Sequence, residues 1–137
     1  MKFYAGTADD EEAEFPYGIC IARGFTEAVR GGHFYYGSLE IRIVHHIDES
    51  RGDEHSRAVR KTQMALVSLA TPAHDSALEL VVEGVAPQET RQAPGSQVFA
   101  DIIPLTMGVR DLNPANDDAI EGRTEAAFAE YLTTATA

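Results

Sequence analysis

Tryptophan is absent from the sequence, cysteine occurs once (Cys20), and long apolar runs are missing. A single cysteine excludes an intrachain disulfide and fits a chain assembled in a reducing cytoplasm. No window approaches the roughly 18 uninterrupted apolar residues that a membrane-spanning helix requires. The first fifteen residues carry one lysine followed by acids, which differs from a signal peptide. We therefore expect a soluble protein with no membrane partner.

Basic residues are also scarce, with 11 lysines and arginines against 22 aspartates and glutamates and a net charge of -11. Residues 1–16 carry five acids and one base (net -4), and residues 111–137 carry six acids and one base (net -5). Between them, residues 17–110 hold eleven acids against nine bases, a net of -2. Nucleic-acid binding through phosphates requires clustered Lys and Arg, so this composition argues against it.

The length and composition fit one globular unit with its own core. The chain has 137 residues, of which 44% are hydrophobic and 24% are charged. A chain of this size can bury a core without disulfides or metals. We divide it into an acidic N-terminal segment (1–15), a single α+β domain (16–112) and an acidic C-terminal arm or short helix (113–137).

Hydrophobic alternation predicts two long strands joined by a turn. Tyr17, Ile19 and Ile21 alternate with smaller residues, which is a β pattern. A longer alternation runs through residues 34–47, and the glycines of residues 30–33 lie between the two runs. This arrangement is typical of a β-hairpin.

The next segment changes to a helical period. Apolar residues at i, i+3 and i+4 spacing predict one main helix from about Glu54 to Ala70. Asp53 stands in the N-cap position, and Pro72 follows the expected end. The outer side of this helix carries Arg57, Arg60 and Lys61.

The remaining sequence predicts two further strands and a terminal element. Residues 80–86 and 98–112 alternate as strands around a polar loop, residues 88–97. Pro104 inside the second run suggests an edge strand, a bulge or a break. Residues after 119 have helical spacing, weakened by Gly122, and predict a short C-terminal helix or a docking arm. The predicted fold class is α+β: an antiparallel sheet of about four strands that begins with a long β-hairpin, with one main helix packed on one face.

Three histidines and several acids crowd the boundary between the second strand and the helix. His45 and His46 are adjacent on a strand, so their side chains point to opposite faces and cannot bind one ion together. His45 shares a face with Ile41, Ile43 and Ile47, where we expect a hydrogen-bonded histidine at the edge of the core.

The other polar groups of this segment can meet only if the loop folds back on the strand end. They are His46, Asp48, Glu49, Asp53, Glu54 and His55. The H-x-x-x-H and C-x-x-C spacings of zinc sites do not occur, and acids in a first helical turn are favoured by the helix dipole. We therefore predict a polar turn, with no metal, no cofactor and no catalytic residue.

Nothing in the sequence indicates nucleophilic catalysis. Cys20, Ser38, Ser56 and Ser68 have ordinary strand or helix surroundings. The G-x-S-x-G elbow and a glycine-rich phosphate loop after a strand are both missing. We do not expect an enzyme.

Nine residues are candidates for contact with a protein partner, because aromatic and arginine side chains anchor many interfaces. At the hairpin these are Arg30, His33, Phe34 and Tyr35; on the helix, Arg57, Arg60 and Lys61; and near the C-terminus, Phe128 and Tyr131. The alternatives are a solvated basic surface on the helix and ordinary strand packing for the aromatics.

The layout of residues 15–110 resembles a known family. The segments that carry the resemblance are "PYGICIARGFTE", "GSLEIRIVHHID", "DESRGDEHSRAVRKTQMALVSL" and "LELVVEGVAPQETRQAPGSQVFADIIPLTM". Their order, lengths and texture are similar to those of small tail-terminator, or tail-completion, proteins of long-tailed bacteriophages and related head–tail junction proteins. The N-terminal helix usual in that family is not evident in residues 1–14.

The resemblance implies a structural subunit without enzymatic activity or cofactor. Such a subunit forms a ring of about six copies that caps the tail tube and joins it to the head connector or adaptor protein. DNA would pass through the lumen without specific binding, and the protein would be found in the virion neck after assembly in the host cytoplasm.

Two other functions remain open from the residues alone. The chain could be a small bacterial α+β domain that binds a protein through the hairpin or the helix. It could also be a small metal-dependent or acid–base enzyme that uses His46 and His55.

Overall fold

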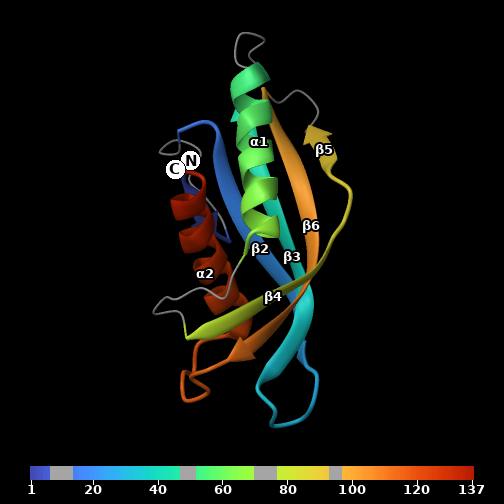
Figure 1. Ribbon diagram of the computed structural model, residues 1–137, viewed down its shortest axis with the longest axis vertical. Coiled ribbons are helices and arrows are strands. Elements are labelled where there is room, and N and C mark those ends of the chain that lie inside the picture. Colours follow the sequence, from blue (N-terminus) through green and yellow to red (C-terminus); the bar gives the residue numbers. More distant parts are fainter. Residues whose placement is uncertain (7–13, 47–51, 70–76, 93–96) are drawn as a thin grey trace.

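The computed structural model describes residues 1–6, 14–46, 52–69, 77–92 and 97–137. Within these residues, six strands and two helices follow in this order (Figure 1): β1 (Phe3–Ala5), β2 (Tyr17–Glu27), β3 (Phe34–His46), α1 (Gly52–Val67), β4 (Leu78–Val85), β5 (Glu89–Gln92), β6 (Val98–Asp111) and α2 (Ile120–Ala135). The α+β class predicted from the sequence is confirmed.

The strands form one mixed sheet in the order β1-β2-β3-β6-β4, with β5 also paired to β6. β2 and β3 form the predicted antiparallel hairpin. β4 and β5 lie one after the other along the same side of β6, whereas β1 pairs with β2 in parallel. The predicted sheet of about four antiparallel strands was too small. β1 is three residues long and β5 is polar and exposed, so neither has the hydrophobic alternation that marks a strand.

Pro104 does not interrupt β6, which is an internal strand that runs unbroken from Val98 to Asp111. The carbonyl of Pro104 accepts the backbone N–H of Ala86 at 2.9 Å, at the break between β4 and β5. A residue in an antiparallel strand directs its N–H and C=O to the same side. The N–H that proline lacks would therefore point toward the break between β4 and β5. Its absence costs no hydrogen bond between β6 and β3.

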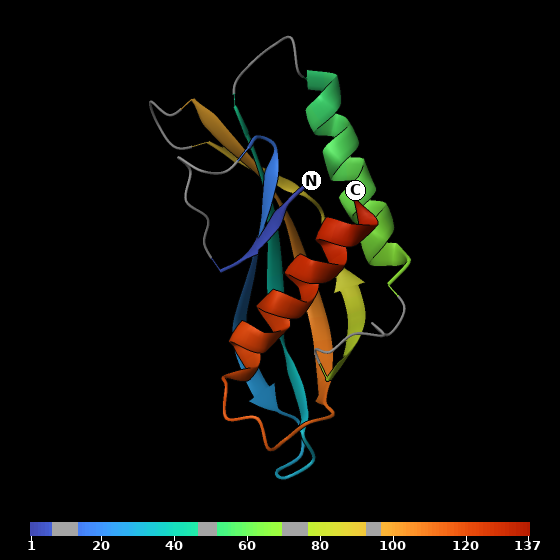
Figure 2. The same cartoon turned by 90° about the vertical axis from the view of Figure 1, so that its left-hand side faces the viewer.

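Both helices pack on one face of the sheet (Figure 2). α1 starts at Gly52, so Asp53 lies in its first turn and not at the N-cap; Ala70 and Pro72 lie outside the described residues. α2 packs against β1 and β2, and the hydroxyl of Tyr131 donates to the carbonyl of Ala65 in α1 at 2.7 Å. The expected short helix or arm at the C-terminus is a full core helix of 16 residues.

The core lies between the sheet and the two helices. Its fully buried side chains include Ile41 and Ile43 of β3, Ile103 of β6 and Phe128 of α2. Burying an aliphatic or aromatic side chain of this size stabilises the fold by about 1.5–3 kcal/mol. Phe3 belongs to the same core and lies over Gly18, where a side chain on β2 would collide with its ring. The core thus includes residues from both sides of the 16–112 range.

Candidate functional site

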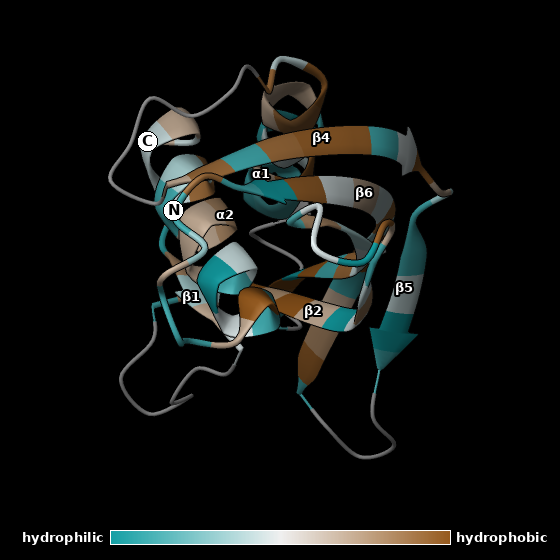
Figure 3. Ribbon diagram, turned by 90° about the horizontal axis from the view of Figure 1, so that it is seen from below, coloured by the Kyte–Doolittle hydropathy of each residue, from teal (hydrophilic) through white to brown (hydrophobic). Residues whose placement is uncertain are grey.

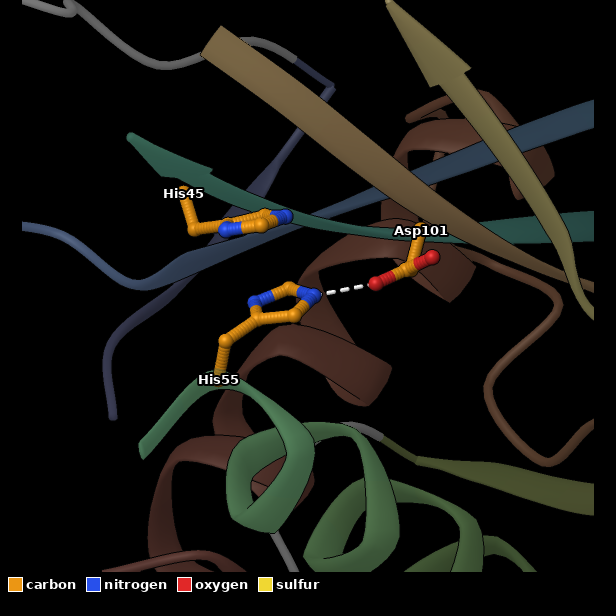
Figure 4. Close-up of side chains that lie close together, drawn as sticks. All are labelled: His45, His55 and Asp101. Carbon is orange, nitrogen blue, oxygen red and sulfur yellow. Dashed lines mark hydrogen bonds and ion pairs between the residues drawn. The ribbon is translucent and has the colours of Figure 1, made fainter. Parts of the chain in front are cut away.

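Three polar side chains from three elements meet between the start of α1 and the sheet (Figure 4). They are His45 of β3, His55 of α1 and Asp101 of β6, whose possible ligand atoms all lie within 4.8 Å of one another. The rings of His45 and His55 are stacked with their centroids 3.2 Å apart. Nε2 of His55 forms a hydrogen bond with Oδ2 of Asp101. We call these three residues the histidine–aspartate cluster.

The sheet register explains why these residues meet. His45 lies opposite Phe99, and Asp101 lies opposite Ile43, so both polar side chains project from the helix-covered face on neighbouring strands. His55 reaches them from the first turn of α1. Residues 46 positions apart in the sequence are thereby placed in contact.

Asp101 is 5% exposed and is held from both sides. Its Oδ1 accepts a hydrogen bond from the Thr90 hydroxyl at 2.5 Å, while Oδ2 faces His55. Burial alone would raise the pKa of this carboxyl group, but hydrogen bonds from Thr90, His55 and Gln88 hold the pKa below its usual value. Asp101 is therefore a carboxylate at neutral pH.

The histidines of the cluster are partly buried. Burial and the neighbouring His55 lower the pKa of His45, against the opposing effect of Asp101. His45 is therefore neutral at neutral pH and has a lone pair available for a ligand. Nδ1 of His55 is buried, and no atom of the described residues forms a hydrogen bond with it.

His45 and His46 do point to opposite faces, as the sequence predicted. His46 is exposed and lies against Phe15, with the ring centroids 4.1 Å apart, and the structure does not bring it to His55. Asp53 and Glu54 are exposed in the first turn of α1, while Asp48 and Glu49 lie outside the described residues. The sequence reasoning missed Asp101. The available signal was an acid at an inward position of an otherwise apolar strand.

Cys20 is not available for chemistry. Its side chain is fully buried in the core. Burial, and then the nearby Glu125, raise the pKa of the thiol. Cys20 therefore remains a neutral thiol that packs as a small apolar residue.

The hairpin candidates have unequal exposure. Arg30 and His33 are exposed in the turn, where the Glu27 carboxylate accepts the backbone N–H groups of Gly31 and His33 at 2.8 and 3.2 Å. Phe34 is half-buried against Tyr36. Tyr35 packs against the core.

The helical candidates divide in the same way. Arg57, Arg60 and Lys61 are exposed on α1 and remain available to a partner. Phe128 has no exposed surface, so it is a core residue, and Tyr131 is half-buried and bonded to α1.

The structure also has an exposed apolar surface that the sequence did not predict. Val67 of α1 and Val81 and Val85 of β4 are 83%, 41% and 47% exposed and line one groove between α1 and β4. Met64, one helical turn before Val67, is 63% exposed. We call this groove, together with Met64 beside it, the β4 groove.

Comparison with protein-family models and with curated proteins finds no match to this chain. Neither helix in the described part of the chain has both the length and the apolar character that a bilayer crossing requires.

Proposed function

We propose that this protein is a structural subunit of a phage head–tail junction, a tail terminator that assembles into a homo-oligomeric ring of about six copies. The ring would cap the tail tube and join it to the head connector or adaptor protein in the virion. The proposal starts from the resemblance in element order given above. The structural observation that carries it is the β4 groove.

The β4 groove has the character of a contact surface. Exposed apolar side chains that line one depression mark interaction sites more often than scattered ones do. β4 is also an outermost strand of the sheet, and an edge strand offers unpaired backbone groups to another chain. Figure 3 shows the contrast along this side of the sheet, with β4 largely hydrophobic and β5 hydrophilic.

A second copy of this chain is the occupant that we propose. The sheet ends in two unlike edges, β4 on one side and β1 beside α2 on the other. A contact between two different surfaces repeats head to tail and closes a ring when the rotation fits. Charge favours this pairing, because α1 exposes Arg57, Arg60 and Lys61, whereas the α2 side exposes Asp117, Asp118 and Glu130.

The net charge of -11 suits the inside of such a ring. DNA slides most freely past a wall that does not attract phosphates, and phosphate binding requires clustered cations. The ring therefore needs no specific DNA contact.

Light scattering on the purified protein tests the proposal, alone and mixed with a tail tube protein from the same gene neighbourhood. We expect a particle of about six times the 14.9 kDa chain mass, alone or on mixing. The double variant Val67→Lys/Val81→Lys should remain monomeric, while the control Leu112→Lys, at a 59% exposed site elsewhere, should assemble. Circular dichroism verifies that each variant is folded.

A strict monomer that ignores the tube protein would contradict the ring and favour a small bacterial protein-binding domain. A ring that also forms from the double variant would leave the ring in place and remove the β4 groove as its interface.

A further inference from the structure

We propose that the histidine–aspartate cluster binds one divalent transition-metal ion of the zinc type, with one ring nitrogen from each of His45 and His55 and one carboxylate oxygen from Asp101. This ion would connect β3, α1 and β6. The proposal is independent of ring formation and revises the sequence-based prediction that the chain has no metal.

The donor set selects the class of ion. Two imidazole nitrogens and one carboxylate oxygen suit Zn²⁺, Co²⁺, Ni²⁺ or Fe²⁺, whereas Mg²⁺ and Ca²⁺ prefer oxygen donors alone. Zinc lies about 2.0–2.2 Å from such donors, which places neighbouring donors about 3–4 Å apart. The observed separations reach 4.8 Å, which is close to this range. An ion between His55 and Asp101 would replace the hydrogen bond that now joins them. The stacked rings must tilt so that both lone pairs point at the ion.

Neighbouring residues hold the proposed ligands in place. Thr90 binds Oδ1 of Asp101 and so orients the carboxylate, which leaves Oδ2 directed at the histidines. Metal-ligating carboxylates are commonly held by such outer hydrogen bonds. The ring of Phe99 is stacked beside that of His45, with the centroids 5.2 Å apart, and forms an apolar side of the site.

Nδ1 of His55 provides an independent observation. It is buried, and the described residues give it no hydrogen-bond partner. Buried polar atoms without partners are rare, and a bound ion or a water molecule is one explanation for them. Within the described part of the chain, the hydrogen bonds of this cluster are thus incomplete. Three ligands also leave a fourth position for a water molecule or another donor.

The test uses the full chain, stripped of metal with a chelator and titrated with Zn²⁺ by calorimetry and with Co²⁺ by visible absorption. We expect one equivalent to bind, with the intense Co²⁺ bands of a low-coordinate site. His45→Gln, His55→Gln and Asp101→Asn should each weaken Zn²⁺ binding by at least about 10-fold. His46→Gln and His33→Gln are the matched controls, because both histidines are exposed, and they should change binding less than about twofold.

A measurement on the unchanged chain covers the case in which a ligand variant fails to fold. Zn²⁺ should slow amide hydrogen exchange in the first turn of α1, which holds His55, and leave α2 unaffected. The proposal is overturned if no saturable binding occurs at one equivalent, if His46→Gln weakens binding as much as His55→Gln does, or if Zn²⁺ does not change exchange in α1.

Discussion

Two buried aspartates lie near opposite ends of β6, and their surroundings differ. Asp111 receives two hydrogen bonds from the guanidinium of Arg123, at 2.8 and 2.9 Å, and a third from the backbone N–H of Asn113 at 2.9 Å. Asp101 is bonded to Thr90 and His55, but the far nitrogen of that histidine has no partner among the described residues. Asp111 thus has three hydrogen bonds from charged or backbone donors, whereas Asp101 belongs to a cluster that the described residues leave incomplete.

The difference indicates different roles. Asp111 and Arg123 form a two-pronged ion pair with side chains only 6% and 9% exposed, which fastens the start of α2 to the end of β6. Such a pair is costly to break because the remaining charge stays buried. The histidine–aspartate cluster combines two imidazoles with one carboxylate, which are the donor types that bind zinc-type ions.

The largest effect is expected when the Asp111 pair is broken. Arg123→Met should lower the free energy of unfolding by about 3–5 kcal/mol, because Asp111 is left buried without its partner. Urea denaturation measures the loss. The comparison is Glu89→Ala, which removes an exposed pair with Arg91 and should cost less than about 1 kcal/mol. Equal losses in the two variants would show that burial does not distinguish the pairs.

An intermediate effect is expected from acid. The hydrogen bonds from Arg123, followed by the one from Asn113, outweigh burial and hold the pKa of Asp111 below its ordinary value of 3.8. A lowered pKa in the folded state stabilises the fold above the unfolded pKa, and this contribution is lost as the pH falls through the folded pKa. Stability should therefore decline below about pH 4.

Urea midpoints measured at falling pH follow this loss. Asp111→Asn should show a shallower decline than the unchanged chain, since it lacks the titrating group. A decline of the same steepness in both proteins would rule out Asp111 as a source of the acid sensitivity.

The smallest effect on stability is expected at Thr90. Thr90→Val removes the hydroxyl that orients Asp101 and should cost about 1 kcal/mol of stability without metal. With metal, Zn²⁺ affinity should fall by about 10- to 100-fold, the range seen when an outer hydrogen bond to a ligand is lost. Thr106→Val, at an exposed position of β6, is the control. If Zn²⁺ affinity is unchanged in Thr90→Val, this hydroxyl does not contribute to metal binding.

The sequence predicted those elements whose hydrophobic period is long. The β2–β3 hairpin, α1, β4 and β6 each repeat apolar residues over eight or more positions. β1 and β5 lack such a repeat. They are strands because they pair with a longer neighbour, β2 and β6 respectively. The sequence also did not predict that α2 is a buried core helix, since the burial of Phe128 depends on where β1 and β2 lie.

The candidate site was predictable only in part. Strand alternation correctly separated His45 from His46. The meeting of His45 with Asp101 depends on the register between β3 and β6, and the position of His55 depends on how α1 packs on the sheet. Neither is encoded in local spacing, so the local signal for Asp101 was its inward position on β6.

A crystal of the protein grown with Zn²⁺, with diffraction recorded on both sides of the zinc absorption edge, tests the metal assignment most directly. We expect one strong anomalous peak among His45, His55 and Asp101, with all three side chains turned toward it. An empty cluster, with zinc bound only at exposed histidines such as His46, would contradict it.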